Sequence, residues 1–511
     1  VLRDFDISVE DVKGKLLKLR ADKSGGPDEL KPRLLLNILE EISEPLCLLF
    51  NRSLKEGVVP GDWKNANVCP IFKNGSRHLA ANYRPVSLTS QICKVFESLM
   101  RDVIVRHLED NELLKDSQHG FRRGRSCLTN LLTFLDRVSG CLDEGEAVDV
   151  VFLDFAKAFD KVPHHRLSKK LRSHGIDGAV RTWIEQWLSG RKQRVGIGGV
   201  MSSWRGVDSG VPQGSVLGPV LFLIYINDLD EGISNWILKF ADDTKMFGRV
   251  GRQQESDDMQ KDIDRLVQWS LEWQMLFNVK KCRAMHMGRQ LIQRDYVMNG
   301  VCLETVEEEK DLGVIIRSDL KASSQCTQAY LKANRMLGVM NRTIQYKTRE
   351  VMLSLYKTLV RPLLEFSTAA WSPHYVKDRV QLERIQRRFT RMIPELKEMT
   401  YEKRLAQLGL WTLEERRNRA DLLEVFKMHR GLTKIPFERF FELDGSRRTR
   451  GHPLKLKKHR CSTDLRQHFF SERVINRWNG LSSDIVETKS VNAFKKGLQM
   501  MRDTRKGLFM D

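Results

Sequence analysis

The stretch Lys239-Phe240-Ala241-Asp242-Asp243-Thr244-Lys245 places two adjacent carboxylates between the apolar runs 236–240 and 246–247. These runs predict two strands joined in a hairpin, with the two acids at its tip. Adjacent carboxylates repel each other, so a pair held at such a tip indicates a divalent cation that stabilises both ionised forms. The alternative is an ordinary exposed turn, in which aspartate is common.

A third acid favours the metal interpretation. The run 147–153 is rich in β-branched residues and predicts a buried strand, and Asp154 follows it directly. The end of a central strand is a place where catalytic groups are commonly presented, although a salt bridge is the ordinary alternative. The chain between Asp154 and Asp242 is long enough for a helical crossover that would bring the two strands side by side.

The composition is that of a soluble globular protein of three or four domains. The chain has 511 residues, 41% hydrophobic and 30% charged, with a mean hydropathy of -0.41. No apolar run reaches the roughly 18 residues of a transmembrane helix, so we expect no membrane partner. The 9 cysteines include no C-x-x-C pair, which indicates a reducing, intracellular compartment without disulfides or structural zinc. Because the chain begins at Val1 without a signal peptide, we expect it to be a piece of a longer polypeptide.

The net charge of +20 is confined to the last part of the chain. Residues 321–511 hold 40 Lys and Arg against 20 Asp and Glu, whereas residues 1–320 hold 46 of each. Such a localised excess indicates a polyanionic partner, most simply nucleic acid, whose phosphates attract Lys and Arg. A solubilising helical surface is the alternative.

Three segments favour contacts with phosphate or nucleotide groups. Runs 63–73 and 82–88 predict a β-ribbon that could lay Lys73 or Arg84 over a phosphate. The loop 118–126 contains three arginines and two glycines and suits a triphosphate, although a merely solvated basic loop is equally consistent with it. The loop 209–219 contains three glycines and two prolines, with Gln213 as a polar probe, and suits a molecule lying against the backbone.

The helical periodicity divides the chain into parts. It predicts helices at 8–20 and 32–54, the second kinked or interrupted at Pro45. Beyond about Ala322 we expect long helices with dense basic clusters and no strong strands. We therefore place a domain boundary near Leu320 and a softer one near Pro394.

A polymerase that uses two magnesium ions needs few protein ligands. Each ion prefers an octahedron of oxygens with one or two protein carboxylates, and substrate and water supply the rest. Asp154 together with Asp242 and Asp243 meets that count. We therefore expect two Mg²⁺ ions, with Mn²⁺ able to replace them.

Six segments also occur in the order of the reverse transcriptase motifs. They are 82–88, 118–126, 152–160, 209–219, 240–244 and 311–313. Over nearly its whole length, the chain resembles the reverse transcriptase of non-long-terminal-repeat retrotransposons, most closely the jockey-like and chicken-repeat-like long interspersed elements. Segments 359–365 and 469–474 also look like that group's downstream region.

The resemblance implies an α+β fold, the right-hand polymerase with fingers, an antiparallel-sheet palm and a helical thumb, followed by a basic, mainly helical C-terminal region. It implies an N-terminal fingers extension at 1–53 and a reverse transcriptase domain of fingers and palm at 54–318. The thumb would occupy 320–394. The nucleic-acid-binding C-terminal region would occupy 395–511.

The resemblance implies roles for residues around the acids. Asp154 and Asp242 would be metal ligands and Asp243 a supporting acid, with the Phe155 carbonyl beside the second metal. Phe159 matches the aromatic steric gate that crowds a ribose 2′ hydroxyl and so selects deoxynucleotides.

Further residues would surround the substrates. Lys281 matches the lysine that protonates pyrophosphate, and the turn Leu312-Gly313 would steady the primer end. The residues implied to bind the incoming nucleotide are Lys73, Arg84, Arg122, Phe155, Ala156, Phe159, Gln213 and Gly214.

The implied activity is RNA-directed DNA synthesis, in which element RNA is copied from a 3′ hydroxyl of a nicked target. The expected partners are an RNA template, a DNA primer or target and deoxynucleoside triphosphates, in a ribonucleoprotein of nucleus and cytoplasm. An upstream endonuclease is expected in the parent polypeptide and is absent from this chain. Two alternatives stay open: a catalytically idle, element-derived RNA-binding protein, and an RNA-dependent RNA polymerase, which would not be expected to have an aromatic residue at position 159.

Overall fold

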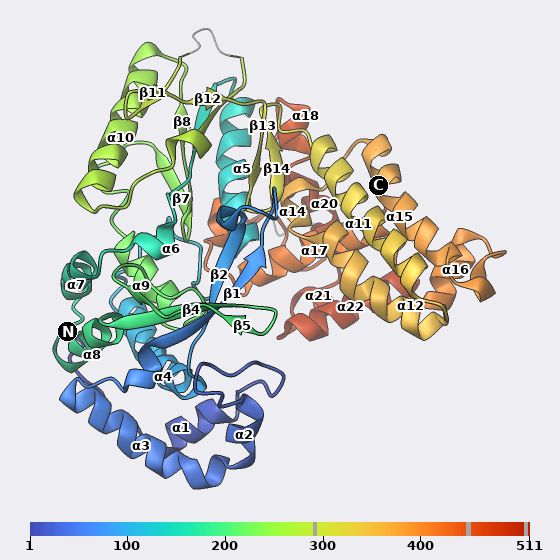
Figure 1. The fold of residues 1–511 in the computed structure, drawn as a ribbon. Coiled ribbons are helices and arrows are strands. Elements are labelled where there is room, and N and C mark those ends of the chain that lie inside the picture. Colours follow the sequence, from blue (N-terminus) through green and yellow to red (C-terminus); the bar gives the residue numbers. More distant parts are fainter. Residues whose placement is uncertain (290–293, 446–450, 505–508, 511) are drawn as a thin grey trace.

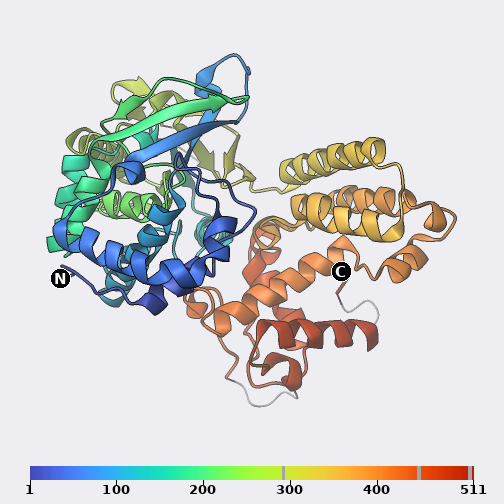
Figure 2. The same cartoon turned by 60° about the horizontal axis from the view of Figure 1, so that its bottom comes forward.

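The computed structural model describes residues 1–289, 294–445, 451–504 and 509–510. One lobe contains both large sheets, and a mainly helical lobe lies beside it (Figures 1 and 2). Among the described residues, no helix combines the length and the apolar character that a membrane span requires.

The central sheet carries the hairpin with the two adjacent acids. Its strands are β3 (Val148–Leu153), β7 (Trp236–Phe240), β8 (Asp243–Arg249), β9 (Arg283–Met287) and β12 (Glu304–Thr305). The order is β12-β9-β3-β8-β7, with every neighbouring pair antiparallel except β12 and β9. The predicted strand, hairpin and antiparallel palm are therefore confirmed, with one short parallel edge strand in addition.

The central strand β3 is buried because helices cover both faces of the sheet. Val148 and Val150 pack in one apolar cluster with α5 (Cys127–Asp143). Val151 points to the other face and packs in a second cluster with α9 (Gly218–Tyr225). A strand with no solvent-facing side is apolar at nearly every position, which explains the uninterrupted β-branched run.

A second sheet forms the predicted fingers. Its strands are β1 (Asn65–Phe72), β2 (Tyr83–Leu88), β4 (Arg191–Ile197), β5 (Val200–Met201) and β6 (Arg205–Val207). β1 pairs antiparallel with β2 and parallel with β4, and β4 also pairs with β5 and β6. The predicted β-ribbon over 63–73 and 82–88 is the β1–β2 pair, so that prediction is confirmed.

The helices of this lobe surround the two sheets. They are α1 (Val9–Leu16), α2 (Pro32–Asn37), α3 (Leu39–Glu56), α4 (Gln91–Asp110), α6 (Ala158–Lys161), α7 (His164–Ser173), α8 (Gly178–Leu188) and α10 (Gln253–Glu272), with 3₁₀ turns η1 (Gly61–Lys64) and η2 (Ala80–Asn82).

The predicted interruption at Pro45 is wrong. The break falls at Ile38, where φ is -113° and ψ is 26°, and Pro45 lies inside α3. A proline leaves the carbonyl four residues earlier without its helical donor, and that residue, Glu41, is exposed, so water can replace the donor.

Helices predominate beyond the sheets, as predicted. The strands β10 (Val297–Met298), β11 (Val301–Cys302), β13 (Glu308–Asp311) and β14 (Val314–Arg317) lead into α11 (Ser323–Thr343), α12 (Arg349–Leu355), a π-helical turn (Tyr356–Val360), α13 (Arg361–Glu365), α14 (Thr368–Trp371) and α15 (Val376–Arg391). α11 packs along α15. Tyr356 stacks on Phe389 with ring centroids 4.0 Å apart, and its hydroxyl donates to Gln386 Oε1 at 2.8 Å.

The C-terminal region packs against the palm helix α5. Its helices are α16 (Tyr401–Leu408), α17 (Leu413–His429), α18 (Asp464–Gln467), α19 (Phe470–Arg473), α20 (Ile475–Asn479), α21 (Ser483–Val486) and α22 (Val491–Thr504), with 3₁₀ turns at Pro394–Leu396 and Phe437–Arg439. Both α14 and α18 contact α5, which lies between them and the sheet (Figure 1). One continuous apolar cluster includes residues of α5, α15, α17 and α20. The core therefore runs without a break across Pro394, where we expected a soft boundary.

Polar contacts add to this apolar interface. Arg466 Nη1 donates to Asp136 Oδ1 at 2.8 Å and to Ser139 Oγ at 2.9 Å. Asp143 Oδ1 accepts from the backbone N–H of Thr463 at 2.7 Å. The side chains of Arg466 and Asp136 are only 19% and 10% exposed, so this ion pair is largely shielded from water.

We expect Arg466→Leu to lower the free energy of unfolding by about 3 kcal/mol, because it leaves the buried Asp136 carboxylate without its closest cation. Urea unfolding measures the change. Arg20→Leu is the control, since Arg20 and its partner Asp22 are 69% and 61% exposed, and such surface pairs contribute less than about 1 kcal/mol. Equal effects of the two substitutions would contradict a stabilising interface between α5 and the C-terminal region.

Candidate active site

The tip of the β7–β8 hairpin presents the two adjacent acids. Phe240 pairs with Asp243, so Ala241 and Asp242 form the two-residue turn. Ala241 has a φ of +56°, in the left-handed region that a residue with a Cβ occupies at a cost of roughly 1–2 kcal/mol. The structure around the turn has to compensate for that cost.

The third acid is brought to the same edge by strand register. Leu153, the last residue of β3, pairs with Thr244 of β8. Asp154 therefore emerges beside Asp242 and Asp243, as the sequence predicts. Asp154 is distant from this pair in the sequence, and the pairing of β3 with β8 brings the three acids together.

The loop before α5 holds the turn from the other side. Gln118 Oε1 accepts from the N–H of Ala241 at 2.9 Å and from the N–H of Gly120 at 2.7 Å. Backbone hydrogen bonds join Lys239 to Ser117 and His119, each at 2.8 Å, so this loop forms a single parallel β-bridge with β7. A Cβ on Gly120 would lie 2.4 Å from the Ala241 nitrogen, which only glycine avoids. Gln118, which is 1% exposed, is thus a positioning residue that the sequence reasoning did not identify.

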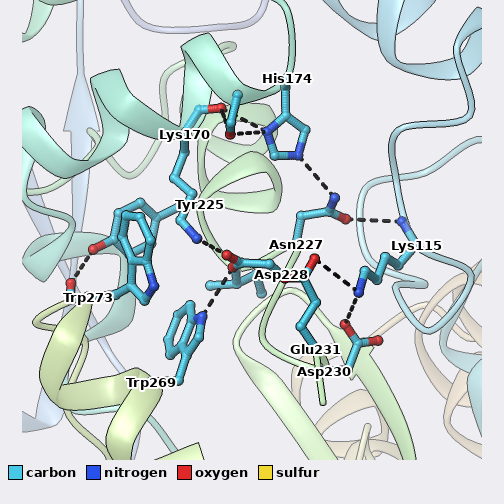
Figure 3. Close-up of polar contacts among 12 residues, drawn as sticks. Lys115, Lys170, His174, Tyr225, Asn227, Asp228, Asp230, Glu231, Trp269 and Trp273 are labelled. Atoms are coloured by element: carbon cyan, nitrogen blue, oxygen red, sulfur yellow. Dashed lines mark hydrogen bonds and ion pairs between the residues drawn. The ribbon is translucent and has the colours of Figure 1, made fainter. Parts of the chain in front are cut away.

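A polar network anchors the segment that leads into β7 (Figure 3). Asp228 forms an ion pair with Lys170 of α7 and accepts from Trp269 Nε1 of α10 at 3.1 Å. Asn227 accepts from the Lys115 backbone N–H at 3.0 Å and donates to His174 Nε2 at 3.0 Å. Two helices and the loop before α5 therefore fix one short segment.

Lys239 connects this network to the hairpin. Its side chain is fully buried, and its ammonium lies 3.2 Å from Asp230 Oδ1 and donates to the Asn227 carbonyl at 2.9 Å. Burial lowers the pKa of Lys239, and the Asp230 carboxylate opposes that shift. Lys239 therefore supports the hairpin from the protein interior, and its ammonium does not face the three acids.

Burial and neighbouring carboxylates raise the pKa of two of the three acids, Asp242 and Asp243. Burial raises the pKa of Asp242, and the negative charge of Asp154 adds to the shift. Burial together with the charges of Asp242, Asp311 and Asp154 raises the pKa of Asp243 to about 6. Asp243 keeps an exposed edge, so water screens part of this repulsion. A cluster of acids that favours protonation is the electrostatic environment in which a divalent cation is most stabilising.

Basic residues from other segments surround the acids. The charges of Arg84 and Lys73, on and just after the fingers ribbon, oppose the rise in the Asp242 pKa, so both lie within electrostatic reach of it. Lys281, in the 3₁₀ turn η3 (Val279–Lys281), places Nζ 3.3 Å from Asp154 Oδ2. The structure therefore brings these three predicted residues to the site.

Phe159 lies on a firm aromatic support. Its ring stacks on Phe222 of α9 with centroids 4.4 Å apart and planes at 15°. The Phe159 carbonyl accepts from the N–H of Val211 at 2.7 Å. The ring position is therefore coupled to the loop 209–219 on the same side of the sheet.

That loop is locked between fingers and palm. Gln213 Nε2 donates to Asp160 Oδ1 at 3.0 Å, and the Gln213 carbonyl accepts from the N–H of Ser87 in β2 at 2.7 Å. Gly214 has a φ of +111°, and a Cβ there would lie 2.6 Å from the Ser87 carbonyl oxygen. Both residues therefore tie the fingers ribbon to the segment after Asp154.

Arg122 has a different environment from the one expected. Its Nη1 donates to the carbonyl of Lys115 at 2.8 Å and to that of Gln118 at 3.4 Å, and among the described residues it forms no hydrogen bond or ion pair with the three acids. The guanidinium holds the loop that supports the turn at Ala241 and Asp242. Its proposed contact with a triphosphate stays a prediction.

The remaining predicted residues lie on neighbouring segments. Phe155 stacks on Phe277 with centroids 4.5 Å apart, and the N–H of Ala156 donates to the Leu276 carbonyl at 2.9 Å. Leu312 and Gly313 form the β13–β14 turn, with φ values of 45° and 89°. That turn packs closely against the helical lobe, because a Cβ on Gly313 would lie 3.2 Å from the Phe366 ring.

The donor set fits divalent cations of the Mg²⁺ type. Asp154, Asp242 and Asp243 offer carboxylate oxygens, which hard cations prefer. The mutual repulsion of the three acids is relieved when a cation binds. The residues present therefore suit the predicted metal site.

We expect this site to make stability depend on pH and on the cation. Because the folded pKa of Asp243 lies near 6 instead of 3.8, its ionisation costs folding free energy, and without metal this cost grows as the pH rises from about 4 to about 6. Mg²⁺ binds the ionised form and should therefore raise the melting temperature more at pH 7 than at pH 5. Calorimetry with and without EDTA measures this, and Asp243→Asn should reduce the difference; an unchanged difference in that variant would contradict the assignment.

Comparisons with known proteins agree with this geometry. The family model described as reverse transcriptase (RNA-dependent DNA polymerase) matches residues 71–336, more than half of the chain. The RNA-directed DNA polymerase from mobile element jockey of Drosophila funebris is 28% identical over 377 residues, which are 71% of this chain and 41% of that protein. The probable RNA-directed DNA polymerase from transposon X-element of Drosophila melanogaster is 26% identical over 360 residues, 68% of this chain and 39% of that protein.

The chain thus spans about two fifths of the length of these relatives. A solved structure of apo telomerase from Candida tropicalis aligns over 73% of this chain and 66% of that one, with 13% identity and a TM-score of 0.41, too low to carry an argument. The predicted resemblance to the jockey-like group is confirmed by the named relatives. With its three acids at one sheet edge and a matching model over more than half its length, the chain belongs to the reverse transcriptase family.

Proposed function

We propose that this chain is the RNA-directed DNA polymerase of a long interspersed element, which copies element RNA into DNA from a primer 3′ hydroxyl. The observation that carries the proposal is the convergence of Asp154, Asp242 and Asp243 at one edge of the palm, facing basic residues of the fingers. The jockey and X-element relatives bear the same activity in their names. Target-primed synthesis, starting from a nicked chromosome, is the form of the reaction that the family resemblance favours.

The acids would hold two divalent cations, Mg²⁺ or in its place Mn²⁺. Asp154 and Asp242 are the proposed ligands, with Asp243 as a supporting acid and the Phe155 carbonyl beside the second ion. When bound, the ions supply activation of the attacking hydroxyl and charge stabilisation of the leaving pyrophosphate. The positive φ of Ala241, held by Gln118, keeps the carboxylates in place before substrate arrives.

Basic side chains would orient the triphosphate. Arg84 and Lys73 approach Asp242 from the fingers, where their charges can bind phosphate oxygens. Lys281 lies beside Asp154 and is the proposed proton donor to pyrophosphate. Arg122 is the weakest of the proposed triphosphate contacts, because its guanidinium donates to backbone carbonyls.

The sugar and base would lie between Phe159 and the loop 209–219. Stacking on Phe222 would hold the Phe159 ring in a position where it sterically excludes a ribose 2′ hydroxyl. Gln213 and Gly214, with Ala156 on the palm side, would line the rest of the nucleotide site. Leu312 and Gly313 would steady the primer end.

The parts of the chain would divide the work as in a right-hand polymerase. We propose 1–53 as a fingers extension, 54–318 as fingers and palm, 320–394 as the thumb and 395–511 as a basic region that binds nucleic acid. The RNA template, a DNA primer or target and deoxynucleoside triphosphates are the proposed partners. We propose further that the chain acts within a ribonucleoprotein of nucleus and cytoplasm, in a parent polypeptide that also carries an endonuclease.

We expect Asp242→Asn to reduce DNA synthesis to background, because the substitution removes a ligand charge from the cation site. The measurement is extension of a DNA primer annealed to an RNA template with Mg²⁺ and all four deoxynucleotides. Asp258→Asn, an acid of α10 outside the site, is the matched control and should extend normally. If the unaltered protein binds RNA but incorporates no nucleotide, the idle RNA-binding alternative is correct.

We expect Phe159→Val to raise the incorporation of ribonucleotides relative to deoxynucleotides, because a smaller side chain leaves room for the 2′ hydroxyl. The ratio of kcat/KM for the two sugars, measured on one template, tests this. Deoxynucleotide incorporation should persist in the variant. An unchanged sugar preference would remove the gate assignment, and efficient synthesis of RNA by the unaltered protein would favour an RNA polymerase.

A further inference from the structure

A cavity of about 300 Å³ lies between residues of the thumb and of the C-terminal region, and none of the three acids lines it. All of its lining residues fall between Ser372 and Arg477. Four of them are permanent cations, and two more are amides; within the described part of the chain, no Asp or Glu belongs to the lining. These six residues are Arg379, Lys458, Arg473, Arg477, Asn418 and Gln467, and we call the cavity the basic pocket.

Part of this positive charge is used by the fold itself. Arg473 forms a double ion pair with Asp421, with nitrogen–oxygen distances of 2.8 and 2.9 Å, and the Asp421 side chain is 1% exposed. Arg379 Nη1 lies 2.8 Å from Glu414 Oε1. Arg473 is therefore held in place in the lining of the pocket, and Asp421 largely neutralises its charge.

The cations of the pocket also repel one another. Burial lowers the pKa of Arg477, and the charges of Arg473 and Arg379 lower it further, while the carboxylates of Asp421 and Glu414 oppose these shifts. An anion in the pocket would relieve this crowding of like charges.

A metal ion is a less suitable occupant of the same place. His374 and His468, both in the pocket lining, and Asp464 offer three atoms within 4.8 Å of one another. The two imidazole rings are stacked, however, with centroids 4.3 Å apart and planes at 18°. Lone pairs of ring nitrogens lie in the ring planes, so nearly parallel rings do not aim at one ion. The neighbouring arginines repel a cation in any case.

We propose that the basic pocket binds one phosphodiester group of a nucleic-acid strand that the protein copies or primes from. The inference rests on the proposed function, because it makes that strand the occupant. Arg477 and Lys458 would contact the phosphate oxygens, with Gln467 as a neutral donor. Guanidinium and ammonium groups are the usual protein partners of phosphate.

Two observations favour a nucleic-acid strand over a small free anion. Lys458 and Gln467 are exposed, so the charged lining continues onto the surface, where a polymer can lie. The surrounding residues 321–511 hold 40 basic against 20 acidic side chains, a field that concentrates polyanions. The pocket would then hold one phosphate in a fixed position while the surface attracts the rest of the strand.

The test is the salt dependence of RNA binding by the full chain. Fluorescence anisotropy with a labelled single-stranded RNA gives the association constant over a range of NaCl concentrations. We expect the double variant Lys458→Gln/Arg477→Gln to bind more weakly and to reduce the steepness of the negative slope of log K against log salt by about 0.7, the value for one phosphate contact on a single strand. The double variant Lys489→Gln/Lys496→Gln removes two exposed charges from the same region and should leave the slope unchanged.

Further arms separate the explanations. Arg477→Lys keeps the charge and should bind nearly as the unaltered chain, and melting curves show whether each variant is folded. If both double variants reduce the steepness of the slope equally, the charge acts diffusely and the pocket proposal fails. If sodium phosphate competes no better than NaCl at equal ionic strength against RNA bound to the unaltered chain, the pocket does not recognise phosphate. If phosphate stabilises only the unaltered chain while RNA affinity stays equal in the pocket variant, the occupant is a free anion, and the proposal is also wrong.

This experiment is independent of DNA synthesis. A chain that binds RNA through the pocket but extends no primer would contradict the proposed function and leave the pocket standing. A chain that extends primers normally, with unchanged RNA binding in the pocket variant, would contradict only the pocket.

Discussion

Mutual repulsion among three carboxylates is the constraint on which this structure depends. Asp242 and Asp243 gain nothing for the fold by this proximity, since burial and the charges of neighbouring carboxylates, that of Asp154 among them, disfavour their ionised forms. They stay together because the strand register leaves them no alternative. The central sheet is stabilised elsewhere, by the apolar clusters on its two faces, and these offset the cost at its edge.

Several groups of residues around the acids hold the segments that carry them in position. Gln118 secures the turn, the loop that contains it pairs with β7, and the buried ammonium of Lys239 joins that strand to the network around Asp228. On the side of Phe159, Gln213 and the Phe159 carbonyl connect the loop 209–219 to the segment after Asp154. These supports are hydrogen bonds between buried or part-buried groups, which keep the positions of the acids well defined.

Local patterns in the sequence predict the elements that hold the acids, because a buried strand and a hairpin each have a short signature. The run 147–153 and the stretch around Asp242 illustrate this. Contacts between distant segments were harder to predict. Gln118 gives no local signal of its bond to Ala241, 123 residues away, and the same loop's arginines suggested a substrate contact instead. Pro45 was misjudged because the cost of a proline in a helix depends on whether water can reach the carbonyl of Glu41, which only the fold decides.

Helix α5 belongs to two parts of the molecule at once. One face covers the palm sheet, and the other receives α14 and α18, so its apolar residues are shared between the catalytic lobe and the C-terminal region. Such sharing limits how related proteins can recombine. A chimera joined near Pro394 would pair the α5 surface of one element with helices shaped for another, and the interface would contain voids and unmatched charges such as that of Asp136. Palm and C-terminal region should therefore be inherited and exchanged as one piece, even though the basic region carries no residue of the carboxylate site.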